Sequence, residues 1–298
     1  MDNHRIEAVT AAISYIEAHL DETLRLDAVA DETGYSPYHL HRMFTETAGM
    51  TPHDYIRRRQ LTEAAWRLVF SQAPAMDIAL AAGYESRQAF SSAFKSMYKR
   101  TPMEYRKNGA FYPLQRRLAV NARLFATPLT SDAAVQSISY AVPADLPDWM
   151  EFSSLVIDGF PCFVESLHRE RIQQYIGRKQ AIVMREASVV VGAAAFSVQA
   201  GKTGSIDFLA VHPQYRRCKA PGVCRAEAGA YQCTAAKALL DFITSRPLAG
   251  REVSITTFRQ GDKADTGQRA EYMRLGFIEA EFLTEFGYPT QRLILPSR

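Results

Sequence analysis

A chain of 298 residues is long enough for two domains, and a composition of 47% hydrophobic and 22% charged residues is ordinary for a globular protein. The net charge of +3 singles out no partner. No run approaches the roughly eighteen apolar residues of a membrane span, and the polar start, Met1 to Arg5, is not that of a signal peptide, so we expect a cytoplasmic protein without a membrane partner.

The first predicted element is a helix over residues 4–20, where apolar residues recur at helical spacing. A pattern that begins at Gly34-Tyr35 then returns at Gly83-Tyr84, and each copy closes with Thr-Pro-x-x-Tyr, at 51–55 and at 101–105. Glycine adopts the left-handed conformation that lets one helix end and the next begin. Each copy therefore predicts a helix-turn-helix, with Ser36 and Ser86 as the caps of the second helices.

The second helix of each copy has one apolar face and one polar face. Leu40, Met43 and Phe44 in the first copy, and Phe90 and Phe94 in the second, recur at three- and four-residue steps and predict a buried core. The opposite faces carry side chains that can reach base edges in DNA. These candidate DNA-binding residues are Tyr38, His41, Arg42, Arg87, Gln88, Ser91 and Ser92.

A connecting helix is predicted over 54–69, roughly 24 Å long at 1.5 Å per residue, which suits two units about one turn of DNA apart. Arg57, Arg58 and Arg59 at its start are candidate phosphate contacts, with solvated surface as the alternative. Residues 1–108 hold 13 Lys and Arg against 14 Asp and Glu, a balance of −1. The inference of DNA binding therefore depends on the duplication and not on charge.

These motifs resemble the DNA-binding domain of the AraC/XylS family of bacterial transcription regulators. Gly-Tyr-Ser-x-x-x-Leu-x-Arg-x-Phe, the connecting helix, Gly-Tyr-x-Ser-x-x-x-Phe-x-x-x-Phe-Lys and Thr-Pro-x-x-Tyr-Arg stand in the family's order. The resemblance implies an all-α tandem helix-turn-helix domain over 1–108 that binds double-stranded DNA, and the seven residues above would read the bases. RNA polymerase is a further candidate partner.

The pattern changes in the second half of the chain. Residues 109–135 have no sustained period and are predicted to be a linker. Beyond them, stretches rich in Val, Ile and Phe predict strands over 135–142, 180–185, 189–198, 205–211 and 252–258. Helical periods are found over 166–177, 235–244 and 268–275. Residues 136–298 are thus predicted to form an α/β (α+β) domain with a mixed central sheet, in a multidomain chain.

This second half resembles an N-acetyltransferase of the GNAT superfamily, in the stretch 205–217 and in Tyr272-x-x-x-Gly276-Phe277. The resemblance implies acetyl-CoA as co-substrate and an amine of unknown kind as acceptor. Leu209 and Val211 would then bind the pantetheine arm through their backbone. Tyr272 would protonate the departing thiolate, and a carboxylate, Asp207 or Glu285, would accept the proton of the amine.

The sequence departs from the superfamily where its phosphate-binding loop should pass directly into a helix. About fifteen surplus residues, within 218–234, follow Arg216 and Arg217. Either Gly222 and Val223 rebuild the pyrophosphate site with the two arginines, or that site is lost. Three of the four cysteines fall in the same insertion, at a spacing that does not match a structural zinc site, and we assign no metal.

Three interpretations follow. In the first, a DNA-binding regulator carries an active acetyl-CoA-dependent acyltransferase. In the second, the acyltransferase fold is catalytically degenerate and acts as a ligand sensor or an interaction module. In the third, the chain is only an enzyme and the repeats serve assembly, which the polar faces of both recognition helices disfavour.

Overall fold

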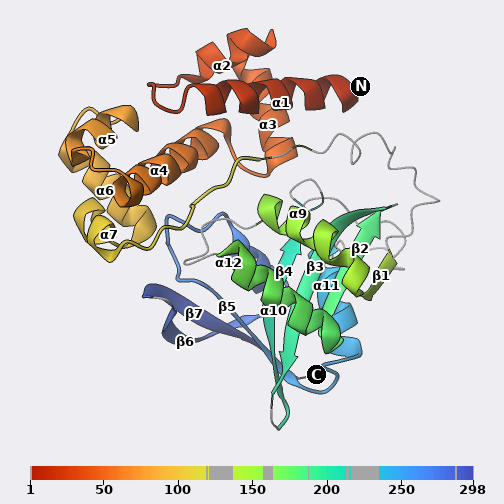
Figure 1. Ribbon diagram of the computed structural model, residues 1–298. Coiled ribbons are helices and arrows are strands. Elements are labelled where there is room, and N and C mark those ends of the chain that lie inside the picture. Colours follow the sequence, from red (N-terminus) through yellow and green to blue (C-terminus); the bar gives the residue numbers. More distant parts are fainter. Residues whose placement is uncertain are drawn as a thin grey trace. The chain divides into compact units, whose positions relative to one another are not determined.

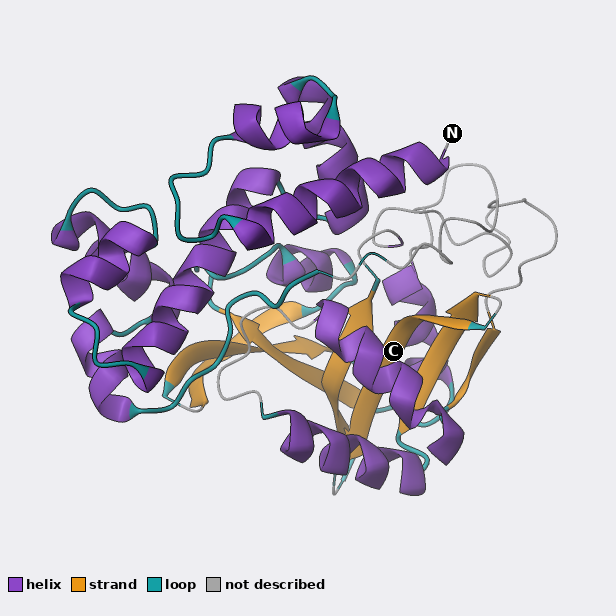
Figure 2. Cartoon of the chain, turned by 45° about the horizontal axis from the view of Figure 1, so that its top comes forward, coloured by secondary structure: helices purple, strands orange, loops and turns teal. Residues whose placement is uncertain are grey.

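The computed structural model describes residues 2–118, 120, 137–156, 164–186, 188–199, 201–212, 215, 235–285 and 287–297. The chain divides into two compact units, one built on the N-terminal helices and one on a β-sheet (Figures 1 and 2). Among the described residues, every helix is too short or too polar to cross a membrane.

The regular elements of the first unit, in its described part, are all helices. The helix and turn boundaries follow the sequence pattern, and each recognition helix is the second helix of its helix-turn-helix. The helices are α1 (Asp2–Ala18), α2 (Leu26–Thr33), α3 (Pro37–Ala48), α4 (Pro52–Phe70), α5 (Ala75–Ala81), α6 (Arg87–Tyr98) and α7 (Pro102–Asn108).

Two apolar groups hold this unit together. The first helix-turn-helix packs under α1, where Val9 and Ile16 meet Leu40 and Phe44 in one buried cluster. The second is centred on rings contributed by α6, α7 and the segment that follows them: Phe94 stacks on Tyr98 at 4.4 Å between ring centroids, and Tyr98 lies 5.1 Å from Tyr112. Burial of such rings dominates core energetics, so each module has its own core.

The segment after α7 does not leave this unit at once. Tyr112 and Leu118 are nearly fully buried and Leu114 is fully buried. Thr62 on α4 accepts the backbone N–H of Leu114 at 3.0 Å, and the Tyr55 hydroxyl accepts that of Leu118 at 3.2 Å. We call residues 110–118 the arm. It lies along α4, at the beginning of the stretch that the sequence predicts to be a linker.

The second unit contains one seven-stranded mixed sheet of order β1-β2-β3-β4-β5-β7-β6 among its described residues. Only the β4–β5 pair is parallel; the other neighbours are antiparallel. The strands are β1 (Ser137–Tyr140), β2 (Ala181–Glu186), β3 (Val189–Val198), β4 (Thr203–Val211), β5 (Glu252–Phe258), β6 (Ile278–Glu285) and β7 (Tyr288–Leu295).

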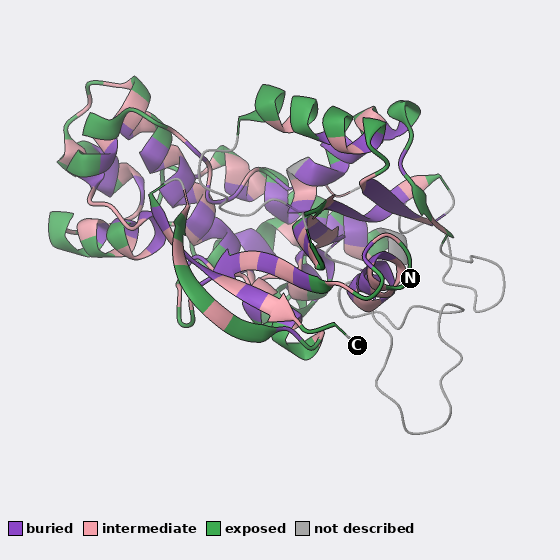
Figure 3. Cartoon of the chain, turned by 90° about the horizontal axis from the view of Figure 1, so that it is seen from below, coloured by how far each residue is buried: buried purple, intermediate pink, exposed green. Residues whose placement is uncertain are grey.

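Helices cover both faces of this sheet (Figure 1), and their inner sides carry the buried residues (Figure 3). On one face Trp149 and Ile172 pack against Val183 and Ala193. On the other, a Cβ at Gly192 would lie 3.0 Å from Leu239, which explains why this close approach takes glycine. The helices are α9 (Leu146–Val156), α10 (Glu165–Gly177), α11 (Ala235–Ser245) and α12 (Gln268–Arg274), with a short 3-10 helix at Pro143–Asp145.

All five predicted strands and all three helices predicted in this half are confirmed, with small shifts at their ends. The helix α9 and the last two strands, β6 and β7, were not predicted from the sequence. Most of the β6 side chains are exposed, so the strand lacks the alternation of apolar and polar residues by which a half-buried strand is recognised.

Candidate functional site

Each recognition helix begins at a serine whose side chain accepts a hydrogen bond from its first turn. Ser36 Oγ accepts the backbone N–H of His39 at 3.3 Å, and Ser86 Oγ accepts that of Ala89 at 3.2 Å. Both predicted caps are therefore confirmed. The turns ahead of them are made by glycines with left-handed φ angles of 71° and 78°, at Gly34 and Gly83.

The predicted base-reading side chains lie on the outer faces of these two helices. The inner faces are closed by Leu40 and Phe44 on α3 and by Phe90 and Phe94 on α6, all fully buried. Tyr38 is 79% exposed. The structure places Ser91 half-buried and leaves the other six exposed: Tyr38, His41, Arg42, Arg87, Gln88 and Ser92.

Three further exposed residues share these faces and were not predicted. His39 precedes Arg42 by one helical turn, and Ala89 and Lys95 flank Ser92 by three residues on either side. Helical spacing from the predicted set would have found them. Ala89 offers a methyl group, which suits contact with the methyl of thymine.

The three arginines at the start of α4 do not share one role. Arg58 is only 3% exposed and donates to the backbone oxygen of Leu114 at 3.4 Å. Arg59 binds Glu17 of α1 through two nitrogens, at 2.7 and 2.8 Å. The interpretation of Arg58 as a phosphate contact or as solvated surface is therefore wrong: its guanidinium holds the arm against α4.

In the second unit, β4 departs from regular pairing at the predicted catalytic residue Asp207. Opposite it, Ala195 pairs with Phe208 and Phe196 pairs with Ile206, so Asp207 is the extra residue of a β-bulge. On its other side β4 pairs with β5 only as far as Ile206 and Ile255. Beyond the bulge, β4 is no longer paired with β5.

A small pocket of about 20 Å³ lies against this end of β4. Three of the predicted residues, Leu209, Val211 and Tyr272, line it together with Ala236 and Glu271. Tyr272 is 7% exposed, and its hydroxyl donates to the backbone oxygen of Leu209 at 3.5 Å. The structure thus places the phenol of Tyr272 beside the end of β4 that pairs with β3 but not with β5.

Asp207 does not line that pocket; its exposed carboxylate accepts hydrogen bonds from three hydroxyl groups. Tyr175 of α10 donates to it at 2.7 Å and Ser205 at 2.8 Å, and Ser197 of β3 donates as well. Burial and the bond to Asp207 raise the pKa of Tyr175 to about 12, so this phenol stays a donor at neutral pH. Three of the roughly four acceptor positions of this carboxylate are therefore occupied by hydroxyl groups of the protein.

Among the described residues, the structure does not bring Glu285 to Asp207 or Tyr272. Glu285, the alternative base, ends β6, which lies beyond β5 and β7 from β4. Arg216, Arg217, Gly222 and Val223 lie outside the described residues, as do the cysteines of the insertion.

A half-buried imidazole near the bulge, that of His168, was not predicted from the sequence. His168 of α10 shares a hydrogen bond of 3.1 Å with the hydroxyl of the fully buried Ser153, and its ring centroid is 6.0 Å from that of Phe208. Burial, with Arg171 adding to it, lowers the pKa of His168 to about 4. The ring is therefore neutral at physiological pH.

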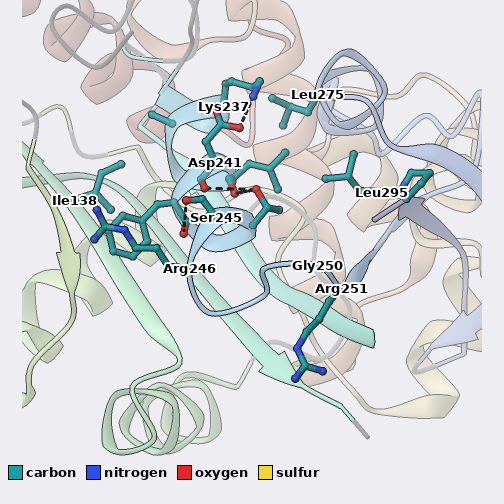
Figure 4. A pocket seen from close by; sticks show the side chains of 14 residues that line it. Ile138, Lys237, Asp241, Ser245, Arg246, Gly250, Arg251, Leu275 and Leu295 are labelled. Atoms are coloured by element: carbon teal, nitrogen blue, oxygen red, sulfur yellow. Dashed lines mark hydrogen bonds and ion pairs between the residues drawn. The ribbon is translucent and has the colours of Figure 1, made fainter. Parts of the chain in front are cut away.

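A larger pocket, of about 600 Å³, lies around the C-terminal half of α11 (Figure 4). Its charged groups are engaged within the protein: Lys237 pairs with Asp241, Arg251 donates to the backbone oxygen of Gly201 at 2.6 Å, and Arg246 stacks 4.4 Å above Phe242. This pocket is separate from the one at the end of β4. Because its charged groups bind one another, the backbone or an aromatic ring, they do not indicate which ligand it would bind.

Comparison with known proteins supports the assignment of the first unit as a helix-turn-helix domain. Residues 29–108 match the family model of a helix-turn-helix domain. Over 94 residues the chain is 44% identical to the regulatory protein SoxS of Escherichia coli (strain K12), covering 32% of this chain and 88% of SoxS. Over 114 residues it is 38% identical to the transcriptional regulator Rob of Salmonella typhimurium, covering 38% of this chain and 39% of Rob.

Among solved structures, a GNAT-family acetyltransferase from Bacillus cereus ATCC 10987 aligns with 55% of this chain and 98% of its own, at 12% identity and a TM-score of 0.38. A likeness at that score carries no conclusion about the second unit, whose function has to be derived from its own geometry.

Proposed function

The chain belongs, through its helix-turn-helix unit, to the AraC family of DNA-binding transcription regulators, and on that basis we propose that α3 and α6 read the bases of two successive major grooves. One observation carries this proposal: both helices are capped at a serine and expose polar side chains over their first turns. The helix α4 between the two modules has 19 residues, roughly 28 Å at 1.5 Å per residue, which is close to one turn of DNA.

The test of base reading is Arg42→Ala in the full chain. An arginine that binds guanine through two hydrogen bonds provides about 1–3 kcal/mol of discrimination, so the variant should lose about 5- to 150-fold at one base pair. Affinities are measured for duplexes selected from a random library and for each of their single-base variants. The matched control is Arg67→Ala, which removes an arginine from an i,i+4 pair with Glu63 on α4.

An equal loss on selected and random duplexes would assign Arg42 to phosphate binding. The selected duplex would then owe its specificity to other side chains of α3 and α6.

For the second unit, we propose an acetyl-CoA-dependent N-acyltransferase. It is supported by the bulge at Asp207, the end of pairing between β4 and β5, and the position of Tyr272 beside Leu209 of β4. Leu209 and Val211 would bind the pantetheine arm through their backbone, and Tyr272 would donate the proton that the departing thiolate takes up. Binding of the pyrophosphate by Arg216, Arg217, Gly222 and Val223 is part of the same proposal.

A second candidate is the degenerate fold that binds a ligand or a partner without catalysis. It is favoured by the size of the pocket at β4: about 20 Å³ holds no more than a water molecule, because Tyr272 already reaches the Leu209 oxygen.

Two measurements on the intact chain distinguish the candidates: calorimetry of acetyl-CoA binding, and consumption of acetyl-CoA in the presence of a panel of amines. In the acyltransferase, Tyr272→Phe should lower turnover on the order of 10²-fold while CoA affinity stays nearly unchanged. Tyr140→Phe, a change to an exposed tyrosine of β1, is the control. If the intact chain neither binds acetyl-CoA nor consumes it with any amine, the acyltransferase hypothesis is wrong and the hypothesis of a catalytically degenerate fold is kept.

A further inference from the structure

The recognition helix α3 carries a single acidic residue, Glu46, and both of its carboxylate oxygens face arginines. Oε1 lies 3.4 Å from Nε of Arg42, one helical turn earlier on α3. Oε2 lies 3.5 Å from Nη1 of Arg5, which projects from α1. The carboxylate thus joins a candidate base-reading arginine to the helix that packs over the module.

The ion pair with Glu46 involves an atom of Arg42 that is not needed for binding guanine. Guanine is recognised by an arginine that donates to O6 and N7 from two nitrogens at once. The ion pair uses Nε, so the terminal nitrogens of Arg42 are not consumed by it. Because the guanidinium is planar, holding Nε also restricts the orientation of the terminal pair.

The charge of Glu46 would otherwise oppose its position. A carboxylate on a helix that enters a groove is repelled by the phosphates on either side, and α6 has no acidic residue at all. Arg5 offsets that charge from the opposite side of the carboxylate. The negative charge of Glu46 weakens DNA binding, yet the carboxylate is paired with an arginine on each oxygen. A role in orienting Arg42 explains why an acidic residue stands at this position.

We propose that Glu46 is a positioning residue for base recognition: it holds the guanidinium of Arg42 by Nε so that the two terminal nitrogens meet one guanine. This rests on the proposed base-reading role of Arg42. The side chains of Arg42 and Glu46 are 65% and 46% exposed, and exposed ion pairs of this kind contribute little to stability. The effect of Glu46 is therefore on discrimination between bases and not on folding.

The test compares five forms of the full chain on the selected duplex and its single-base variants: wild type, Glu46→Ala, Glu46→Gln, Arg42→Ala and the double variant. Glu46→Ala should lose about two- to fivefold in discrimination at the base pair read by Arg42, the factor expected of an exposed pair. Glu46→Gln, whose neutral oxygen is a weaker acceptor, should fall between wild type and Glu46→Ala. Affinity for random duplexes should not fall, because one negative charge has been removed.

The double variant separates positioning from direct contact. If Glu46 acts through Arg42, adding Glu46→Ala to Arg42→Ala should cost no further discrimination. Glu63→Ala, which breaks the i,i+4 pair with Arg67 on α4, is the matched control and should leave base preference unchanged. Thermal unfolding of each form shows whether it is folded.

Two results would overturn the proposal. One is a Glu46→Ala variant with wild-type discrimination while Arg42→Ala has lost it. The other is a loss that persists in the Arg42→Ala background or falls at another base pair, which would make Glu46 a reader itself. If Arg42→Ala shows no selective loss at any base pair, the base-reading role of Arg42 fails first and this inference fails with it.

Discussion

The three adjacent arginines of α4, Arg57 to Arg59, differ in burial and in the groups that they contact. Arg58 is buried against the arm, Arg59 forms a two-nitrogen ion pair with Glu17, and the charge of Arg57 lies near Tyr84 of the second helix-turn-helix, where it acts against the rise that burial gives the pKa of Tyr84. Each residue of a helix is turned by about 100° from the one before, so three neighbours face three directions. The two backbone oxygens that Arg58 binds, those of Leu114 and Ala264, are 56 and 206 residues away, which no local pattern could have shown.

His168 makes stability depend on pH. Its pKa in the folded chain, about 4, lies below the ordinary value of 6.5, so the unfolded chain binds the proton more tightly. Its contribution to stability is therefore fully present above about pH 6.5 and is lost as the pH falls towards about 4. In chemical unfolding between pH 7.5 and 4, His168→Gln should show a flatter decline than the wild type.

The exposed His53 of α4 provides the control for this measurement, because His53→Gln should leave the decline unchanged. A decline in His168→Gln as steep as that of the wild type would contradict the assignment.

At the scale of elements, the arm completes the first unit. Tyr112, Leu114 and Leu118 are buried, and the backbone of the arm bonds side chains of α4 at two points. Thr62 illustrates the arrangement: its hydroxyl donates to Arg58 O at 2.8 Å and accepts from the backbone of the arm. A helix-turn-helix unit without the arm would leave this side of α4 open to water.

A fragment that ends at residue 108 should therefore be less stable than one that ends at residue 118. The shorter fragment lacks the buried side chains of Tyr112, Leu114 and Leu118, and the hydroxyl groups of Thr62 and Tyr55 lose the backbone N–H groups that they accept. We expect a net loss of about 1–3 kcal/mol, which lowers the melting temperature by at least about 4 °C. Thermal unfolding of the two fragments measures it, and equal melting temperatures would show that the arm contributes nothing.

At the scale of the whole molecule, each unit has its own core. One buried cluster gathers residues of α1 to α4 with Leu118, and another gathers α9 and α10 with the central strands. The two proposed activities can therefore be altered separately in the intact chain. Arg42→Ala should leave acetyl-CoA binding unchanged, and Tyr272→Phe should leave base preference unchanged, which makes each variant a control for the other.

The second unit shows where prediction from sequence ends. The strands β2 to β5 are rich in Val, Ile and Phe because both faces of the sheet are covered, and they were predicted correctly. The strand β6, at the edge of the sheet, carries exposed side chains such as Phe282 and Ile278 and gave no such signal. The pocket of Leu209, Val211 and Tyr272 followed from the resemblance, whereas the hydroxyl groups around Asp207 and the imidazole of His168 did not.

The sequence by itself determined the tandem helix-turn-helix, its caps and the faces of its recognition helices, because glycine turns, serine caps and three- and four-residue periods act between near neighbours. Only the tertiary structure decided which polar groups are buried and which are available. Leu114 meets Thr62 across 52 residues, and Tyr175 meets Asp207 across 32. Such partners are brought together by packing of whole elements, whose geometry is not written in any local stretch of the chain.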